Sequence, residues 1–89
     1  MVSVWVFNGS GARFPSGVFE SNAEAELWIR KYNLSGILTE YPLNTLVYHW
    51  AINNRLFLPK KDSHSTVDFI QSFTSASQNH FHYEGGERA

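Results

Sequence analysis

The segment His80-Phe81-His82-Tyr83-Glu84 has the residue types and spacing that come closest to a chemical site. Alternate side chains of a β-strand point to the same side, so His80, His82 and Glu84 would share one face. Two imidazoles and a carboxylate can bind Zn²⁺ or non-haem iron. The set is incomplete, because the fold must supply a further ligand or an open position. A polar strand face, with Phe81 and Tyr83 in the core, is the simpler interpretation, and we predict no metal and no other cofactor.

Catalysis by acid–base or nucleophilic side chains has no local signature in this chain. No G-x-S-x-G, H-E-x-x-H or P-loop pattern is present. The segment Asn8-Gly9-Ser10-Gly11 resembles a phosphate-binding loop, but it lacks the lysine and the following helix, so we interpret it as a turn. Four histidines and frequent serines still permit a site assembled from distant positions; the histidines are His49, His64, His80 and His82.

Several residues have the types that anchor protein–protein interfaces, in which aromatic and arginine side chains are enriched. Glu40 and Tyr41 end a predicted strand with a charge and an amphipathic ring, and Arg13 lies beside a predicted turn. Tyr48 lies off the buried stripe of a predicted helix. The alternative interpretation is that these residues only complete the core. The candidate partner-binding residues are Arg13, Glu40, Tyr41, Tyr48, His80, His82 and Glu84.

Composition limits the classes of protein to which the chain can belong. Its 89 residues suit one domain with a single core, and the absence of cysteine excludes disulfides and thiolate metal sites. The net charge of −1, without a basic stripe, argues against nucleic-acid binding. The short apolar runs and the absence of a signal-peptide pattern predict a cytoplasmic protein that does not enter membranes.

Hydrophobic periodicity and turn residues predict the elements that would position the candidate residues. Strands are expected at residues 2–7, 12–20, 37–41 and 79–84, with a short one at 56–58. A capping box, Ser21 to Glu24, starts a helix that runs to about Tyr32. A second helix is expected at residues 45–54, after an N-cap at Asn44. The period of residues 66–76 is ambiguous, and we interpret them as a third helix.

The helical periods also predict which side chains are buried. The expected stripe of the first helix is Ala25, Trp28, Ile29 and Tyr32, and that of the second helix is Val47, Trp50 and Ala51. Glu26 and Arg30 are expected to pair on the solvent side of the first helix. Residues 85–89 are expected to form a frayed tail.

These elements predict one α+β domain spanning residues 1–89. The sheet would be antiparallel or mixed, with about four or five strands, and two or three helices would pack on one face. The second strand, at residues 12–20, is expected at an edge or interrupted, because Pro15 cannot donate a ladder hydrogen bond.

Four motifs spread over nearly the whole chain resemble a family of small bacterial proteins of unknown function. They are Val4 to Gly9, Arg13 to Phe19, Leu38 to Pro42, and Phe69 to Ala76 with His80 to Tyr83. The resemblance implies no activity and identifies no functional residue. In size and character alone, such proteins are similar to the immunity proteins that neutralise bacterial toxins.

The functional prediction is therefore a non-enzymatic module that binds a protein partner, and specifically an immunity protein that occludes a cognate toxin domain. Such a protein needs a rigid scaffold and a complementary surface, not catalytic residues. One alternative is a small metal-dependent or hydrolytic enzyme that uses the face of His80, His82 and Glu84. Another is a structural protein that self-associates through the apolar excess of its second helix. We expect a monomer or a weak homo-oligomer.

Overall fold

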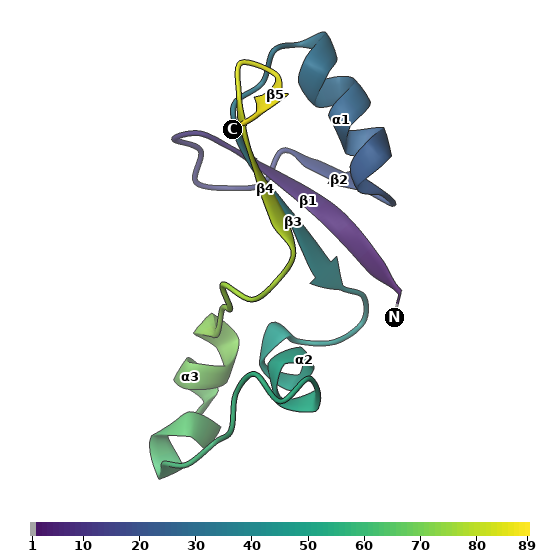
Figure 1. Cartoon of the computed structure of the whole chain (residues 1–89). Helices are drawn as coiled ribbons and strands as arrows, with labels where there is room; N and C mark the ends of the chain where they lie inside the picture. Colours follow the sequence, from purple (N-terminus) through teal and green to yellow (C-terminus); the bar gives the residue numbers. More distant parts are fainter. Residues whose placement is uncertain (1) are drawn as a thin grey trace. The chain divides into compact units, whose positions relative to one another are not determined.

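The computed structural model describes residues 2–89 and has α+β architecture, which confirms the predicted fold class (Figure 1). The chain divides into two compact units. We call residues 2–43 with 78–89 the sheet unit and residues 44–77 the helical unit. The sheet unit contains β1 (Ser3–Gly9), β2 (Gly17–Phe19), α1 (Asn22–Lys31), β3 (Gly36–Pro42), β4 (His80–Glu84) and β5 (Glu87–Arg88). The helical unit contains α2 (Val47–Asn53), the 3₁₀ helix η1 (Asp62–Ser65) and α3 (Val67–Ser72).

The five strands form one sheet in the order β2-β1-β3-β4-β5, and each pair of neighbours is antiparallel. The central pair, β1 and β3, is in register from Ser3 opposite Pro42 to Gly9 opposite Gly36. Gly36 is needed at the end of this pair, because a Cβ there would lie 2.3 Å from the backbone oxygen of Asn8. The close approach of the two backbones therefore excludes any side chain at this position.

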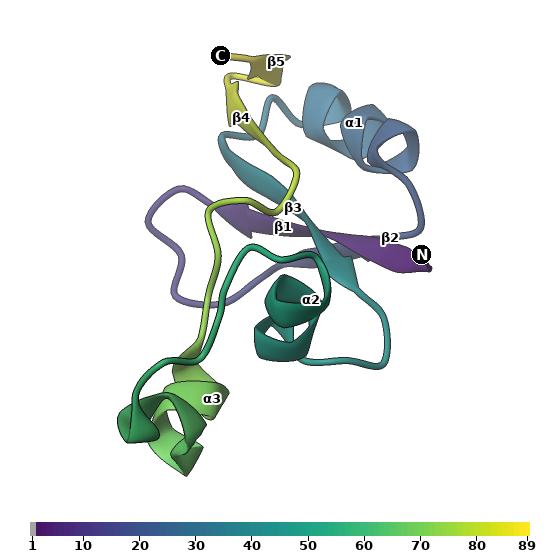
Figure 2. The same ribbon diagram turned by 60° about the horizontal axis from the view of Figure 1, so that its bottom comes forward.

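The core of the sheet unit lies between the sheet and α1, which covers one side of it (Figure 2). Phe7, Leu38 and Tyr83 come from three adjacent strands and pack with Ala25 and Ile29 of α1. Alternation along the strands places one set of side chains in this core and the other set on the opposite face. A ring of partly buried hydrophobic side chains surrounds the core: Trp5, Phe19, Leu34 and Phe81.

Helix α1 begins where the capping box predicted, with the Ser21 hydroxyl accepting a hydrogen bond from the Glu24 amide at 3.1 Å. Its buried stripe, however, is rotated relative to the prediction. Ala25 and Ile29 are buried, but Trp28 and Tyr32 are 48% and 58% exposed. Glu26, expected on the solvent side, is buried. Apolar periodicity could not reveal this, because the partner that makes a buried carboxylate acceptable comes from the C-terminal end of the chain.

Glu26 is the centre of a polar network between α1, β4 and β5. The Tyr83 hydroxyl donates to its Oε2 at 2.5 Å, and Arg88 Nε donates to the same oxygen at 2.6 Å. Arg30 donates to Oε1 at 3.4 Å, so the predicted pair with Arg30 is present within a larger set. The hydrogen bond from Tyr83 and the guanidinium of Arg88 lower the pKa of Glu26. Burial and the Glu26 carboxylate raise the pKa of Tyr83, which stays a donor.

The expectation of a frayed tail at residues 85–89 is wrong. Gly85 and Gly86 turn the chain with positive φ, and β5 then pairs with β4. The Gly86 amide donates to the Leu34 carbonyl at 2.8 Å, and the guanidinium of Arg88 lies 3.8 Å from the ring centre of Phe81. The tail is therefore ordered by Glu26 and Phe81, which are far from it in the sequence.

Two other strand predictions differ from the structure, one in the length of the strand and one in its existence. β2 covers only residues 17–19 of the predicted 12–20, because the turn at Gly11 and the proline at position 15 keep the preceding residues out of the ladder. Residues 56–58 do not form a strand. Arg55, just before them, takes a positive φ, and the three residues pair with no other strand. In the polar segment that follows, residues 62–65 form η1.

The helical unit has an aromatic cluster of its own, which the expectation of a single core did not include. Tyr48 of α2 is buried, and its ring centre lies 5.6 Å from that of Phe73, perpendicular to it. The ring centre of Phe57 lies 4.9 Å from that of Phe73, and Phe57 stacks on Phe69. The His64 ring is tilted against Phe69, with ring centres 4.7 Å apart. Tyr48 therefore takes the buried position of α2 together with Ala51, whereas Val47 and Trp50 are half-buried.

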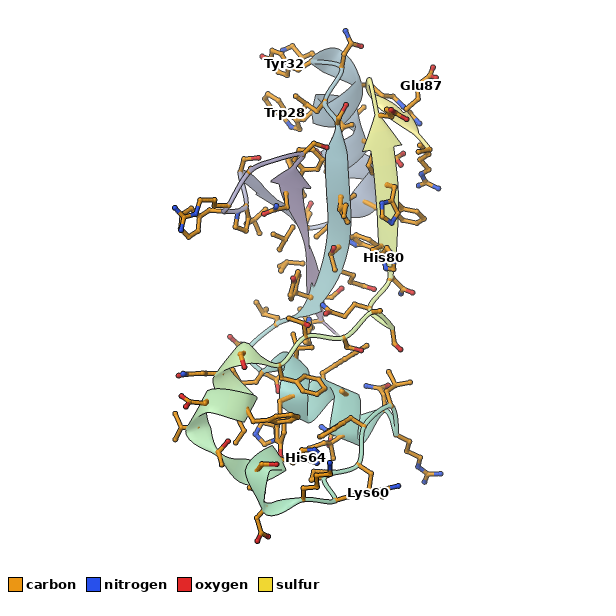
Figure 3. All side chains as sticks on the ribbon, turned by 90° about the vertical axis from the view of Figure 1, so that its left-hand side faces the viewer. Trp28, Tyr32, Lys60, His64, His80 and Glu87 are labelled. Carbon is orange, nitrogen blue, oxygen red and sulfur yellow. The ribbon has the colours of Figure 1, made fainter. Side chains whose placement is uncertain are left out.

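Polar contacts fix the ends of the segments that carry these rings. The Tyr48 hydroxyl donates to the His64 carbonyl at 2.8 Å, and the Nδ1 of His64 accepts from the Lys60 amide at 3.1 Å (Figure 3). Leu46, and not Asn44, is the N-cap of α2, because Asn44 takes a positive φ. Thr66 caps α3.

Helix α3 is confirmed as a helix but is shorter than the predicted 66–76. The Ser72 hydroxyl donates to the Asp68 carbonyl at 2.6 Å, and the following Ser- and Thr-rich residues do not continue the helix. Among residues 2–89, none of the helices is both long enough and apolar enough to cross a bilayer.

The Glu26 network generates the first prediction. Replacing Glu26 with Gln should lower the free energy of unfolding by about 1–3 kcal/mol, because a buried charge-assisted set of hydrogen bonds is weakened. Glu20→Gln, at an exposed position, is the matched control and should change it by less than about 0.5 kcal/mol. Urea denaturation followed by tryptophan fluorescence measures both. Equal effects of the two substitutions would contradict a structural role for the network.

The lowered pKa of Glu26 generates the second prediction. A carboxyl whose pKa is lower in the folded state contributes stability above its unfolded pKa of about 4.3 and loses it as pH falls through the folded value. The difference in unfolding free energy between the wild type and Glu26→Gln should therefore be largest near neutral pH and shrink in acid. Denaturation curves of both proteins between neutral pH and pH 3 test this. A difference that is independent of pH would show that ionised Glu26 is not what stabilises the fold.

The aromatic cluster generates the third prediction. Tyr48→Ala should abolish protection from hydrogen exchange in α2 and α3, because it leaves a cavity in the cluster and removes the hydrogen bond to His64. Tyr48→Phe keeps the ring and should lose only part of the protection. Exchange measured by NMR distinguishes the units, since amides of β1 and β3 should stay protected in both variants. Unchanged protection of α2 in Tyr48→Ala would refute the assignment of this ring as the centre of the helical unit.

Candidate binding face

The sheet face opposite α1 carries most of the candidate residues, and we call it the distal face. The strand register fixes its composition, because side chains paired across neighbouring strands lie on the same side of the sheet. Val6, Thr39 and His80 form one cross-strand row, and Asn8, Ile37 and His82 form the next. The remaining members are Val4 opposite Tyr41, Val18 of β2, and Glu84 opposite Glu87.

Exposed apolar side chains lie among the polar ones on the distal face. Val18 is 65% exposed and Ile37 40% exposed, and Tyr41 is also exposed. His80, His82 and Glu84 are exposed as well. In a half-buried antiparallel strand the solvent side is normally polar. The solvent side of this sheet therefore mixes apolar, aromatic and imidazole groups and is not uniformly polar.

One end of the distal face contains a hollow of about 480 Å³. Its floor and walls come from the turn at residues 8–12, residues 35–37 at the start of β3, residues 82–84 at the end of β4, and Ala89. The Gly-rich turn and the His82/Glu84 pair, far apart in the sequence, thus line the same hollow. The turn is shaped by its own hydrogen bonds, with the Ala12 amide donating to the Gly9 carbonyl at 3.0 Å and the Ser10 amide to the Ser35 carbonyl at 2.9 Å.

The structure brings four of the seven predicted binding residues onto the distal face: Tyr41, His80, His82 and Glu84. Glu40 lies on the α1 side of the sheet. Its carboxylate accepts hydrogen bonds from the Ser3 hydroxyl and, at 2.9 Å, from the Asn79 side chain.

The other two predicted binding residues lie elsewhere. Arg13 is exposed in the β1–β2 connection, where its guanidinium carbon lies 6.0 Å from the ring centre of Phe14. Tyr48 was expected to be left over from the core, but the structure places it at the centre of the aromatic cluster of the helical unit. Its burial leaves little of the ring for a partner.

The three side chains proposed as a metal face are together on the distal face but do not form a complete ligand set. Within residues 2–89, no three His, Cys, Asp or Glu side chains are arranged to hold a metal ion. The ring centres of His80 and His82 are 5.3 Å apart, and Nδ1 of His80 lies 2.7 Å from the Gln78 carbonyl. Because a carbonyl oxygen only accepts, this Nδ1 carries the proton and Nε2 of the neutral ring carries the lone pair.

A second exposed surface lies on the other side of the sheet unit, at the end of α1. Trp28 and Tyr32 lie next to each other with ring centres 6.3 Å apart, and the ammonium group of Lys31 lies within 5.4 Å of both (Figure 3). Beside them is a smaller apolar hollow of about 170 Å³, to which Phe19 and Leu34 contribute. The helical period predicted these two rings to be buried, so sequence reasoning did not propose this surface.

Sequence reasoning also missed Ile37 and the part played by the turn at residues 8–12. The sequence placed Ile37 in a strand but did not indicate which face of the sheet it occupies. Only the register with β1 and β4 shows that it points away from α1. The turn was recognised as a turn, but its position next to His82 depends on the pairing of β3 with both β1 and β4. No local signal in the sequence reports that pairing.

The chain belongs to the family described as "Domain of unknown function (DUF7710)", whose model matches residues 4–89. This confirms the predicted membership of a family of unknown function. No curated protein matches the chain, and no solved structure does.

Proposed function

We propose that this protein is a non-enzymatic binding module that docks a protein partner on the distal face of its sheet. The observation that carries the proposal is that three exposed apolar side chains, Val18, Ile37 and Tyr41, lie among polar groups on one sheet face. Ile37 and Tyr41 supply rigid contact area on β3, and His80 and His82 flank them on β4. Aromatic and aliphatic anchors surrounded by polar groups are typical of interfaces with high affinity.

The sheet provides the rigidity that a binding surface of this kind needs. β3 is hydrogen-bonded on both sides, to β1 and β4, so the backbone that carries Ile37 and Tyr41 is fixed before binding. Groups that are already ordered lose less conformational entropy when a partner binds. This supports a preformed surface rather than one that folds on binding.

The charges at the end of the face favour a basic partner. Glu84 and Glu87 are directly opposite each other in the β4–β5 pair, and both are exposed. Like charges at directly opposed positions destabilise a strand pair. A lysine or arginine of a partner placed over them would remove this repulsion and add complementary attraction.

A basic partner surface is what the active site of a nuclease toxin presents, because it binds phosphates. We therefore propose as the specific role an immunity function in the cytoplasm, in which the distal face occludes a cognate toxin domain. Glu84 would occupy a position that a substrate phosphate otherwise takes. This role rests on charge and surface chemistry together with an analogy of size, and it requires no catalytic residue in this chain.

The proposal predicts a complex with the protein encoded next to this one. Coexpression and size-exclusion chromatography should yield a stable 1:1 complex, and expression of this chain should restore the growth of cells that produce the neighbouring protein. Tyr41→Ala and Ile37→Ser should each weaken the complex at least about tenfold, since truncating a central interface anchor costs more than about 1.4 kcal/mol.

Leu27→Ser is the matched control, because Leu27 is an exposed apolar residue of α1, on the other side of the sheet unit. It should leave both affinity and growth rescue unchanged. Absence of any complex, together with absence of rescue, counts against the immunity role. A complex that Leu27→Ser disrupts and the distal-face variants do not would move the interface to another surface.

A further inference from the structure

We infer that His80 and His82 form a two-histidine binding site for a divalent late transition-metal ion such as Zn²⁺, with solvent completing the coordination. This inference does not depend on the proposed function. It departs from the prediction of no metal made from the sequence alone. It also differs from the metal-dependent enzyme considered above, because Glu84 is not required as a ligand and no reaction is assigned to the ion. Imidazole is a preferred ligand of Zn²⁺, Cu²⁺ and Ni²⁺.

The first support for the site is the distance between the rings. Side chains two residues apart on a strand start roughly 6.6 Å apart, as the rise per residue dictates. The ring centres of His80 and His82 are only 5.3 Å apart, so the rings lean toward each other. Two imidazoles bound to one tetrahedral Zn²⁺ at about 2.0–2.1 Å have ring centres roughly 5 Å apart. The ring centres are therefore already at the spacing that a shared ion requires. The rings are arranged edge to face, at 76°, so rotation about the side-chain bonds of these two exposed residues must still turn both nitrogens toward the ion.

The second support is the tautomer of His80. Its Nδ1–H donates to the Gln78 carbonyl at 2.7 Å, which leaves the lone pair on Nε2. Histidine ligands of metals commonly make this kind of hydrogen bond from the nitrogen that does not bind the ion, and it fixes the ring orientation. His80 thus has the outer hydrogen bond of a metal ligand.

The third support is the stiffness and accessibility of the strand. β4 is in register with β3 at both positions, since Thr39 pairs with His80 and Ile37 with His82. The Ala89 amide donates to the His82 carbonyl at 2.9 Å on the other side. Both imidazoles are nevertheless exposed, so an ion can reach them from solvent. The backbone is thus held on both sides at His82 and on the β3 side at His80, which keeps the two ligands in place before the ion arrives.

The surroundings of the pair favour a cation. Glu84 follows His82 by two residues on the same face, and Glu87 lies opposite Glu84. Their carboxylates raise the local concentration of positive ions without needing to coordinate one. With two protein ligands, about two positions of a tetrahedral ion remain for water or for a donor group on another molecule.

The test is a calorimetric titration of the untagged, full-length protein with ZnCl₂. We expect one ion per chain and a loss of affinity of at least about tenfold in His80→Asn and in His82→Asn, because each removes one of two ligands. His49→Asn is the matched control, because His49 is also exposed but belongs to the helical unit, and it should bind as the wild type does. Circular dichroism of each variant establishes that it is folded.

A second measurement locates the ion. Substoichiometric Cu²⁺ should broaden amide signals of β4 around residues 80–82 and of the neighbouring β3 in ¹H–¹⁵N spectra, and these signals should stay sharp in the His80→Asn variant. Absence of heat with ZnCl₂, or binding that both β4 variants retain, overturns the inference. So does broadening centred on His49 or His64. Because neither measurement involves a protein partner, failure here leaves the proposed function untouched, and failure to find a partner leaves this site untouched.

Discussion

The buried carboxylate of Glu26 is the constraint on which the architecture of the sheet unit depends. A carboxylate away from water is tolerated only where hydrogen bonds and positive charge replace its hydration. Tyr83 and Arg88 supply both, at 2.5 and 2.6 Å from the same oxygen. Because these partners come from β4 and β5, the requirement of one side chain in α1 fixes the last strands of the chain against the first helix. The order of residues 85–89 and the orientation of α1 are two results of the same interaction.

The position of Glu26 also explains why α1 leaves two aromatic rings in solvent. A helix of ten residues can turn only one stripe toward the sheet, and Ala25, Glu26 and Ile29 form that stripe. Trp28 and Tyr32 are then displaced to the edge, where Lys31 lies against them. Apolar periodicity alone would choose an orientation rotated toward Trp28 and Tyr32, which buries more hydrophobic surface. In the observed orientation Glu26 accepts hydrogen bonds from Tyr83 and Arg88, while the rings of Trp28 and Tyr32 stay exposed.

Much of the fold was predictable from the sequence, since its signals are local. The cap at Ser21, the end of β3 at Pro42 and the alternation of residues 80–84 each depend on a few neighbouring residues. The errors share a different cause. Trp28, Tyr48 and the tail were misjudged because the groups that decide their burial are distant in the sequence: Arg88 for α1 and the phenylalanines of residues 57–73 for Tyr48. Part of the candidate face was predictable because His80, His82 and Glu84 lie on one strand, so their shared side follows from local alternation. Their proximity to the turn at residues 8–12 was not predictable, because it depends on strand pairing.

The connection between β3 and β4 has a further consequence. These strands are adjacent and antiparallel, with Thr39 opposite His80 and the Glu40 amide donating to the Asn79 carbonyl at 2.8 Å. The whole helical unit is thus an insertion between two neighbouring strands of the sheet. A short hairpin loop could connect the same two strands without changing the topology. The sheet and the insertion can therefore diverge at different rates in evolution. The insertion can be lengthened, exchanged or lost while the strand order is retained. In this sense the protein is modular at a scale smaller than the usual domain.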